Sequence, residues 1–153
     1  MSVTGRRKRI KTKVIGLTFR EGRLLAFEVT DDQGRLRGVR PLGGSIEYGE
    51  TREEALAREF REELDTRIEI TGEWTTFESV YEKKGETRHE FLFAAPITLL
   101  DCDIPTEGGV IYPEGDGSLC TARWFEIEAL ARGEPTLFPD ALLPFLLSRR
   151  SAE

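Results

Sequence analysis

The amino-acid sequence predicts one globular domain that mixes strands and helices, of the α+β or α/β class. Its 153 residues are enough to bury most of a single hydrophobic core, and no internal repeat or linker divides them. Hydrophobic residues make up 39% of the chain and charged residues 33%, a composition typical of folded proteins. The third observation is periodicity, because β-branched stretches with turn signals lie on both sides of one amphipathic helix.

Three strands are expected before that helix. Residues 12–19 are rich in β-branched side chains, and residues 24–29 form the returning strand after a turn that contains a glycine. A polar turn at 31–34 ends in a second glycine, which adopts positive φ without strain. Residues 35–40 are short and extended, and they end before Pro41, which disfavours helix at the preceding residue.

Two long strands and a final helix are expected after the amphipathic helix. The strands are residues 67–81 and 88–97, joined by a turn at 83–86. A long loop follows at 101–119, and loops of this length are usually functional or disordered. The remaining elements are a strand at 120–125 and a helix at 139–149.

The central helix, residues 51–64, carries its own start signal. Thr51 is the expected N-cap, and Glu54 three residues later completes a capping-box pattern. At about 100° per residue, one contiguous stripe of the helix is apolar and is expected to pack on a sheet. This stripe consists of Leu56, Ala57, Phe60 and Leu64.

A ridge of acidic side chains lies beside the apolar stripe. Glu59 precedes Glu62 and Glu63 by three and four residues, and like charges at these spacings cost a helix about 0.2–0.5 kcal/mol per pair. A divalent cation reverses that cost, because hard cations such as Mg²⁺ take oxygen ligands. We therefore expect a cation site at the border of helix and sheet, where the small Ala55 leaves room for ions.

The charge of the chain is divided unevenly. The net charge is −6, but residues 1–13 carry six basic and no acidic side chains, so the other 140 residues carry −12. An acidic body repels polyanions, which argues against duplex nucleic acid as a partner and calls for cations if phosphates are bound. The run 6–9 fits a nucleic-acid or localisation patch. We favour a solvated basic tail at residues 1–12.

Cysteine usage and hydropathy predict a cytoplasmic protein. Cys102 and Cys120 are too few for a disulfide framework, so a reducing compartment is expected. The longest apolar runs are far too short for a membrane span, and no membrane contact is expected. The basic N-terminal segment lacks the long apolar core and the cleavage site of a signal peptide.

The spacing of glycine and acidic residues resembles a known signature. Gly44 is followed after five residues by Glu50, and after seven more by Arg58-Glu59-Phe60, one further residue and Glu62-Glu63. This pattern resembles the Nudix box, the signature of hydrolases that act on nucleoside diphosphates linked to another moiety. The box covers residues 44–66.

The chain departs from the family pattern at the end of the box. Asp65 and Thr66 stand where the family usually has a glycine and an aliphatic residue. The glycine serves a left-handed cap at the end of the helix, a conformation that Asp adopts at a cost of about 1 kcal/mol. The departure therefore weakens a cap and removes no expected ligand.

The resemblance implies a fold, a reaction and metal ions. The implied fold is the Nudix fold, a mixed β-sheet sandwiched between α-helices, and it fills residues 13–150 as a single domain. The implied reaction is hydrolysis of a pyrophosphate bond with more than one Mg²⁺ or Mn²⁺ ion, which neutralise oxyanions and polarise the attacking water. The implied metal ligands are Glu59, Glu62, Glu63 and the backbone carbonyl of Gly43.

The resemblance also assigns roles beside the metal. Glu50 and Arg58 resemble the buried ion pair that ties the glycine loop to the helix, and they join the three metal carboxylates in the expected catalytic set. The general base stays open between Glu62 and an acid of the 101–118 loop. His89, the only histidine, is expected to be a satisfied residue at the sheet border.

Residues outside the helix are candidates for substrate contacts. Two belong to the loop before the helix, one is a strand tyrosine and three are acids of the long loop. They are Glu47, Tyr48, Tyr81, Glu107, Glu114 and Asp116. The expected substrate is a small nucleotide-derived diphosphate, and a nucleotide sugar, a dinucleotide and a nucleoside triphosphate are equally admissible.

Two alternatives stay open from the sequence. The first is a Nudix-fold module that binds a nucleotide without cleaving it, although the presence of all the box acids counts against it. The second concerns assembly, because a homodimer is open beside a monomer.

Overall fold

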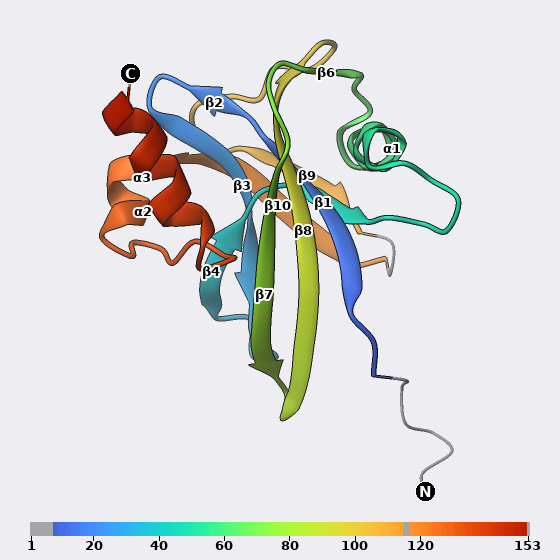
Figure 1. Ribbon diagram of the computed structural model, residues 1–153. Coiled ribbons are helices and arrows are strands. Elements are labelled where there is room, and N and C mark those ends of the chain that lie inside the picture. Colours follow the sequence, from blue (N-terminus) through green and yellow to red (C-terminus); the bar gives the residue numbers. More distant parts are fainter. Residues whose placement is uncertain (1–7, 115–116, 153) are drawn as a thin grey trace, which may run out of the picture.

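Two curved sheets form the centre of the molecule, and helices cover both outer sides (Figure 1). The computed structural model describes residues 8–114 and 117–152. The first sheet has the order β5-β1-β8-β6, and β7 also pairs with β8. Its strands are β1 (Lys11–Leu17), β5 (Gly43–Ser45), β6 (Ile68–Ile70), β7 (Thr75–Lys83) and β8 (Glu86–Leu99).

The second sheet has the order β2-β3-β10-β9, and β4 also pairs with β3. Its strands are β2 (Phe19–Arg20), β3 (Arg23–Thr30), β4 (Leu36–Arg40), β9 (Val110–Pro113) and β10 (Leu119–Glu126). The helices are α1 (Arg52–Leu64), α2 (Ile127–Ala131) and α3 (Leu142–Ala152).

The expected mixed sheet between helices is confirmed. β1 pairs with β8 in parallel but with β5 antiparallel, so the first sheet is mixed. Figure 1 shows α1 on one side of the strands and α2 with α3 on the other. The chain therefore has an α/β layer arrangement in which one helix is separated from the other two by the sheets.

Alternation along the strands supplies two hydrophobic cores. Val14 and Ile15 are both fully buried, but they belong to different clusters of buried side chains. The cluster that contains Ile15 includes side chains of α2 and α3, and the cluster that contains Val14 includes side chains of α1. Because successive side chains of a strand point to opposite faces, burial of both faces explains the continuous apolar run of β1.

The start of α1 agrees with the capping-box prediction. The hydroxyl of Thr51 accepts from the N–H of Glu54 at 3.1 Å, and the Thr51 N–H donates to the Glu54 carboxylate at 3.0 Å. The helix ends at Asp65, which has φ 50° and ψ 45° in the left-handed region. Both ends of the helix are thus determined by local contacts.

The packed face of α1 differs from the predicted stripe. Ala57 is exposed, so its place in the predicted stripe was wrong, whereas Ala55 is fully buried in the core. Leu56 and Phe60 are fully buried as expected. The helix is therefore rotated about its axis so that the side bearing Glu59 and Glu63 turns toward the sheet.

The predicted strand at 67–81 is two strands, β6 and β7. Both pair with β8, but the ladder breaks between Ile70 and Thr75. Pro96 of β8 lies opposite this break; it has no N–H to donate, and its carbonyl accepts from Thr71 at 2.9 Å. The predicted turn at 83–86 is observed, with positive φ at Lys84 and Gly85.

The C-terminal third contains two elements that the sequence did not predict. β9 lies inside the expected loop at 101–119, where its four residues pair with β10. α2 follows β10 directly and is only five residues long. The last helix begins at Leu142, three residues later than expected, so Pro144 falls in its first turn, where a missing N–H costs nothing.

The N-terminal segment is described only in part. Arg6 and Arg7 lie outside the described residues, whereas Lys8 and Arg9 precede β1 without regular structure. β1 already begins at Lys11, inside the expected tail.

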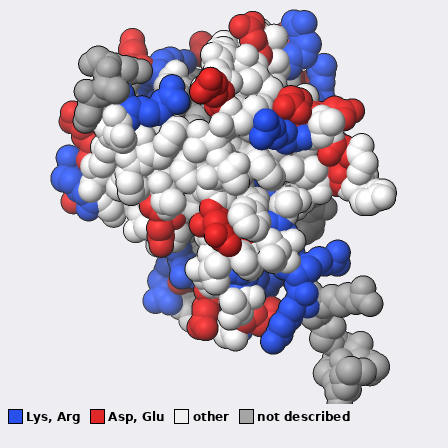
Figure 2. Space-filling model, in the orientation of Figure 1, with Lys and Arg blue, Asp and Glu red and all other residues white. Residues whose placement is uncertain are grey.

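Among the described residues, no helix is long and apolar enough to cross a membrane. Figure 2 shows acidic and basic side chains interspersed over the visible face.

Candidate active site

The glycine turn before α1 is packed too closely to hold side chains. A Cβ atom on Gly43 would overlap the backbone carbonyl of Val14 in β1. A Cβ atom on Gly44 would overlap the carboxylate of Glu59. The two glycines therefore let the backbone of β5 approach the neighbouring strand on one side and a helix carboxylate on the other.

A forked ion pair ties this loop to the helix. Arg58 Nε donates to Glu50 Oε2 at 2.7 Å, and Arg58 Nη2 donates to Glu50 Oε1 at 2.9 Å. The Glu47 N–H donates to the same carboxylate at 3.0 Å, and Arg58 also donates to the Ser45 carbonyl at 3.0 Å. The Arg58 hydrogen bonds, followed by the Glu47 N–H, lower the pKa of Glu50 to about 2.

Arg58 also contacts two of the expected metal carboxylates. Its Nη1 donates to Glu59 Oε1 at 3.1 Å and lies 3.4 Å from Glu62 Oε2. The side chain of Glu59 is 14% exposed and that of Glu62 is 58% exposed. One guanidinium thus holds three carboxylates, with Glu62 as the member that solvent reaches.

Glu63 is the acid of the ridge that Arg58 does not contact. Its Oε2 is buried and accepts no hydrogen bond from the described residues. Burial, followed by the charges of Glu59 and Glu114, raises the pKa of Glu63 to about 9. Burial likewise raises the pKa of Glu59, although Arg58 opposes the shift.

The donor set fits divalent cations of the Mg²⁺ type. The ridge offers carboxylate oxygens, an unpartnered buried oxygen on Glu63 and a Glu59 carboxylate held against Gly44. As the described side chains lie, no three acidic, histidine or cysteine groups converge on one point. Arg58 instead engages Glu59 and Glu62.

One acid of the long loop lies beside the ridge. Glu114, at the end of β9, acts electrostatically on Glu63, and its carboxylate accepts from the Cys120 thiol at 3.0 Å. The Tyr112 hydroxyl is buried and has no hydrogen-bond partner among the described residues, and burial followed by the Glu63 charge raises its pKa. Glu107 is exposed, and Asp116 lies outside the described residues.

The other substrate candidates divide between two places. Glu47 Oε1 lies 3.9 Å from Arg58 Nη1 and so borders the ridge, whereas Tyr48 is fully exposed in the same loop. Tyr81 lies on β7 and donates to Glu90 at 3.2 Å, apart from the box. His89 pairs with Glu78 at 2.7 Å, which satisfies its ring nitrogen within the β7–β8 hairpin.

Tyr81 lines a cavity of about 200 Å³ that the sequence did not predict. The cavity lies between the β3–β4 hairpin, the β7–β8 hairpin and residues 138–140. Its polar lining includes Arg40, a residue that sequence reasoning missed. The available signal was its position, because Arg40 is the last residue of β4 and stands three residues before Gly43.

The family comparison and the comparison with curated relatives both match this chain to Nudix proteins. A NUDIX domain model matches residues 8–145. The nucleoside triphosphatase NudI of Enterobacter sp. (strain 638) is 45% identical over 64 residues, which are 41% of this chain and 45% of that protein. NudI of Escherichia coli O17:K52:H18 is 36% identical over 98 residues, 61% of this chain and 69% of that protein. The chain thus matches less than half of the Enterobacter relative's length.

Solved structures share the fold over nearly the whole chain. The Escherichia coli ORF135 protein superposes with a TM-score of 0.61 at 23% identity, covering 95% of this chain and 94% of that one. A NUDIX hydrolase from Nitrosomonas europaea gives a TM-score of 0.65 at 16% identity, covering 94% and 90%. The NUDIX domain model matches most of the chain, and the glycine turn and the ion-paired acidic helix agree with that match. This chain therefore belongs to the Nudix family of hydrolases, which act on phosphoric anhydride bonds.

Proposed function

We propose that the protein is a Mg²⁺-dependent pyrophosphohydrolase that cleaves a small nucleotide-derived diphosphate in the cytoplasm. The observation that carries the proposal is the Glu63 carboxyl, which is buried with an unpartnered oxygen beside Glu59. With a pKa of about 9 this carboxyl holds a proton at neutral pH, and a divalent cation can replace that proton as the partner of the buried carboxylate. The names of the NudI relatives support a nucleoside triphosphate within this substrate class. Cys102 and Cys120 form no disulfide bond with each other, which supports a reducing compartment.

The side chains of the acidic ridge have different roles in the proposed reaction. Glu59, Glu62, Glu63 and the Gly43 carbonyl would hold the ions, which when bound neutralise phosphate oxyanions and polarise the attacking water. Arg58 keeps Glu59 and Glu62 in place through its two hydrogen-bonded contacts, and its fork with Glu50 anchors the helix to the loop. The general base stays open between Glu62 and Glu114.

The experiment is a substrate panel assayed with Mg²⁺ and with EDTA, read as phosphate release before and after added phosphatase. We expect hydrolysis that EDTA abolishes. Glu62→Gln and Glu63→Gln should each lower kcat by about 10²-fold or more, because charge neutralisation by metal contributes several kcal/mol. Glu69→Gln, an exposed strand residue, is the matched control.

Two outcomes would contradict the proposal. Full activity in either Glu62→Gln or Glu63→Gln would refute the assignment of the site. Calorimetric binding of a nucleotide diphosphate without any hydrolysis in Mg²⁺ or Mn²⁺ would instead favour a binding module. A melting temperature near wild type in Glu62→Gln, whose side chain is exposed, would show that lost activity is not lost folding.

A further inference from the structure

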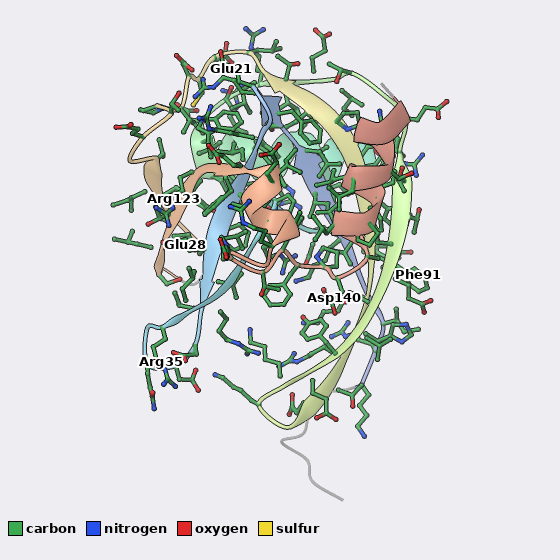
Figure 3. The ribbon with its side chains drawn as sticks, turned by 90° about the vertical axis from the view of Figure 1, so that its left-hand side faces the viewer. Glu21, Glu28, Arg35, Phe91, Arg123 and Asp140 are labelled. Atoms are coloured by element: carbon green, nitrogen blue, oxygen red, sulfur yellow. The ribbon has the colours of Figure 1, made fainter. Side chains whose placement is uncertain are left out.

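The cavity beside Tyr81 is separate from the acidic ridge. Figure 3 shows Asp140 between the β3–β4 hairpin, which carries Arg35, and the β7–β8 hairpin, which carries Phe91. None of the residues that line the cavity belongs to α1 or to the loop 43–50. Its volume of about 200 Å³ is sufficient for a small chemical group and not for a whole dinucleotide.

One acid at the floor of the cavity is already neutralised. Glu90 is 5% exposed, and its Oε2 lies 3.2 Å from Lys13 Nζ. The Tyr81 hydroxyl donates to the same oxygen at 3.2 Å. Burial, followed by the charge of Arg40, lowers the pKa of Lys13.

Arg40 is a partly buried cation that lines this cavity. In the part of the chain that the structure describes, no carboxylate lies within ion-pair distance of its guanidinium, and its buried Nε donates to no acceptor. Its guanidinium lies over the ring of Phe27, 5.7 Å from the ring centre. A partly buried positive charge without a hydrogen-bond acceptor costs free energy. The buried end of the cavity therefore lacks a negative charge that would balance Arg40.

The rim does not supply that charge. Arg37 and Lys83 line it together with Glu82 and Asp140, so the formal charges of the four side chains cancel. Arg37 is exposed at the end of the cavity formed by β4. The rim is therefore neutral overall, and Arg37 offers a second guanidinium on it.

Arg40 also connects the cavity to the ridge. Its charge acts on Lys13 and Tyr81 at the cavity and on Tyr112, which faces Glu63 and Glu114. Along the chain it stands three residues before Gly43. A residue that lines the cavity therefore stands close in sequence to the glycine turn beside the ridge.

We propose that the cavity receives the part of the substrate beyond the diphosphate, and that Arg40, with Arg37, binds an anionic group there. The group is a phosphate or a carboxylate, because the planar guanidinium fork matches both in a bidentate manner. A neutral nucleobase would leave the floor charge uncompensated. This inference rests on the proposed function and narrows its substrate class to diphosphates that carry a second acidic group.

The first test measures binding without catalysis. In EDTA, ¹⁵N-labelled protein is titrated with inorganic phosphate, against sodium chloride at equal ionic strength, and the Arg Nε–H resonances are followed. We expect one saturable shift that is absent in Arg40→Gln and retained in Arg9→Gln, an exposed arginine outside the cavity. Arg40→Lys, which keeps the charge but not the fork, should weaken phosphate binding. No saturable shift in wild type, or the same shift in Arg40→Gln, would overturn the inference.

The second test asks whether the anion belongs to the substrate. Two pairs of compounds differ by one phosphate remote from the pyrophosphate: NADPH with NADH, and coenzyme A with dephospho-coenzyme A. Each compound is assayed for hydrolysis and as a competitor of the best panel substrate. We expect the phosphorylated member of at least one pair to be favoured by about tenfold or more, the value of a hydrogen bond to a charged group.

The variants separate this inference from the proposed function. Arg40→Gln should lose the preference for the phosphorylated member, and Arg9→Gln should keep it. Equal handling of both members in both pairs would contradict the inference even if hydrolysis is fast. Absent hydrolysis with Mg²⁺, alongside phosphate binding at Arg40 in EDTA, would contradict the proposed function instead.

Discussion

Arg58 and Glu50 meet through two parallel hydrogen bonds, Nε to Oε2 at 2.7 Å and Nη2 to Oε1 at 2.9 Å. The same guanidinium contacts Glu59 and Glu62 through its third nitrogen. The position of the acidic ridge relative to the glycine loop is therefore set by one side chain. This arrangement makes the geometry of the fork testable separately from its charge.

Arg58→Lys keeps the charge but removes the fork. A lysine ammonium is a point charge that does not hold Glu50 and Glu59 in fixed relative positions. We expect kcat to fall by about 10²-fold, the cost of a misplacement of about 1 Å. Arg61→Lys, an exposed arginine on the next turn, should leave kcat unchanged. Wild-type kcat in Arg58→Lys would show that the fork does not position the ridge.

Glu50 should make stability depend on pH on the acid side. Its pKa is lowered from 4.5 to about 2 in the folded state, so its contribution is fully present above about pH 4.5 and is lost as the pH falls through about 2. The free energy of unfolding of wild type should exceed that of Glu50→Gln by a constant amount above pH 5. Urea denaturation at a series of pH values should show this difference vanish near pH 2. A difference that is unchanged from pH 5 to pH 2 would refute the assignment.

Gly44→Ala should displace the Glu59 carboxylate. The added methyl group would overlap that carboxylate, which Arg58 holds from its other side. We expect weaker Mg²⁺ binding by calorimetry and lower kcat. Gly34→Ala is the matched control, because its added methyl group meets no atom within 4 Å while its positive φ imposes backbone strain. Mg²⁺ affinity equal to wild type in Gly44→Ala would contradict the close approach.

Asp65→Gly should stabilise the protein. Asp65 ends α1 with φ 50°, a conformation that costs a non-glycine residue about 1 kcal/mol or more. Its exposed contact with Arg61 at 3.5 Å contributes little. We expect the free energy of unfolding to rise by about 1 kcal/mol with unchanged kcat, measured by urea denaturation. Asp65→Ala should bring no such gain, because alanine pays the same conformational cost.

The features that local sequence specified were predicted well. The capping box of α1 depends on Thr51 and Glu54, three residues apart, and the structure contains both hydrogen bonds. The turn at 83–86 depends on a glycine that takes positive φ. Such contacts join residues within one turn of chain, so composition and spacing are enough to indicate them.

The features that depend on distant neighbours were predicted poorly. The break between β6 and β7 follows from Pro96, more than twenty residues further along the chain, which interrupts the pairing. β9 is too short to show periodicity and exists because β10 pairs with it. The rotation of α1 that buries Ala55 and exposes Ala57 follows from the surface on which the helix packs.

The sequence by itself determined the family, the start of the central helix and the presence of an acidic ridge behind a glycine turn, because spacing along one helix and one loop encodes them. Only the tertiary structure decided that, among the described residues, a buried oxygen of Glu63 has no hydrogen-bond partner and the buried Nε of Arg40 has none. Glu63 and Arg40 look like ordinary charged residues in the sequence. Their environments come from strands that are remote along the chain, and desolvation depends on that surrounding structure.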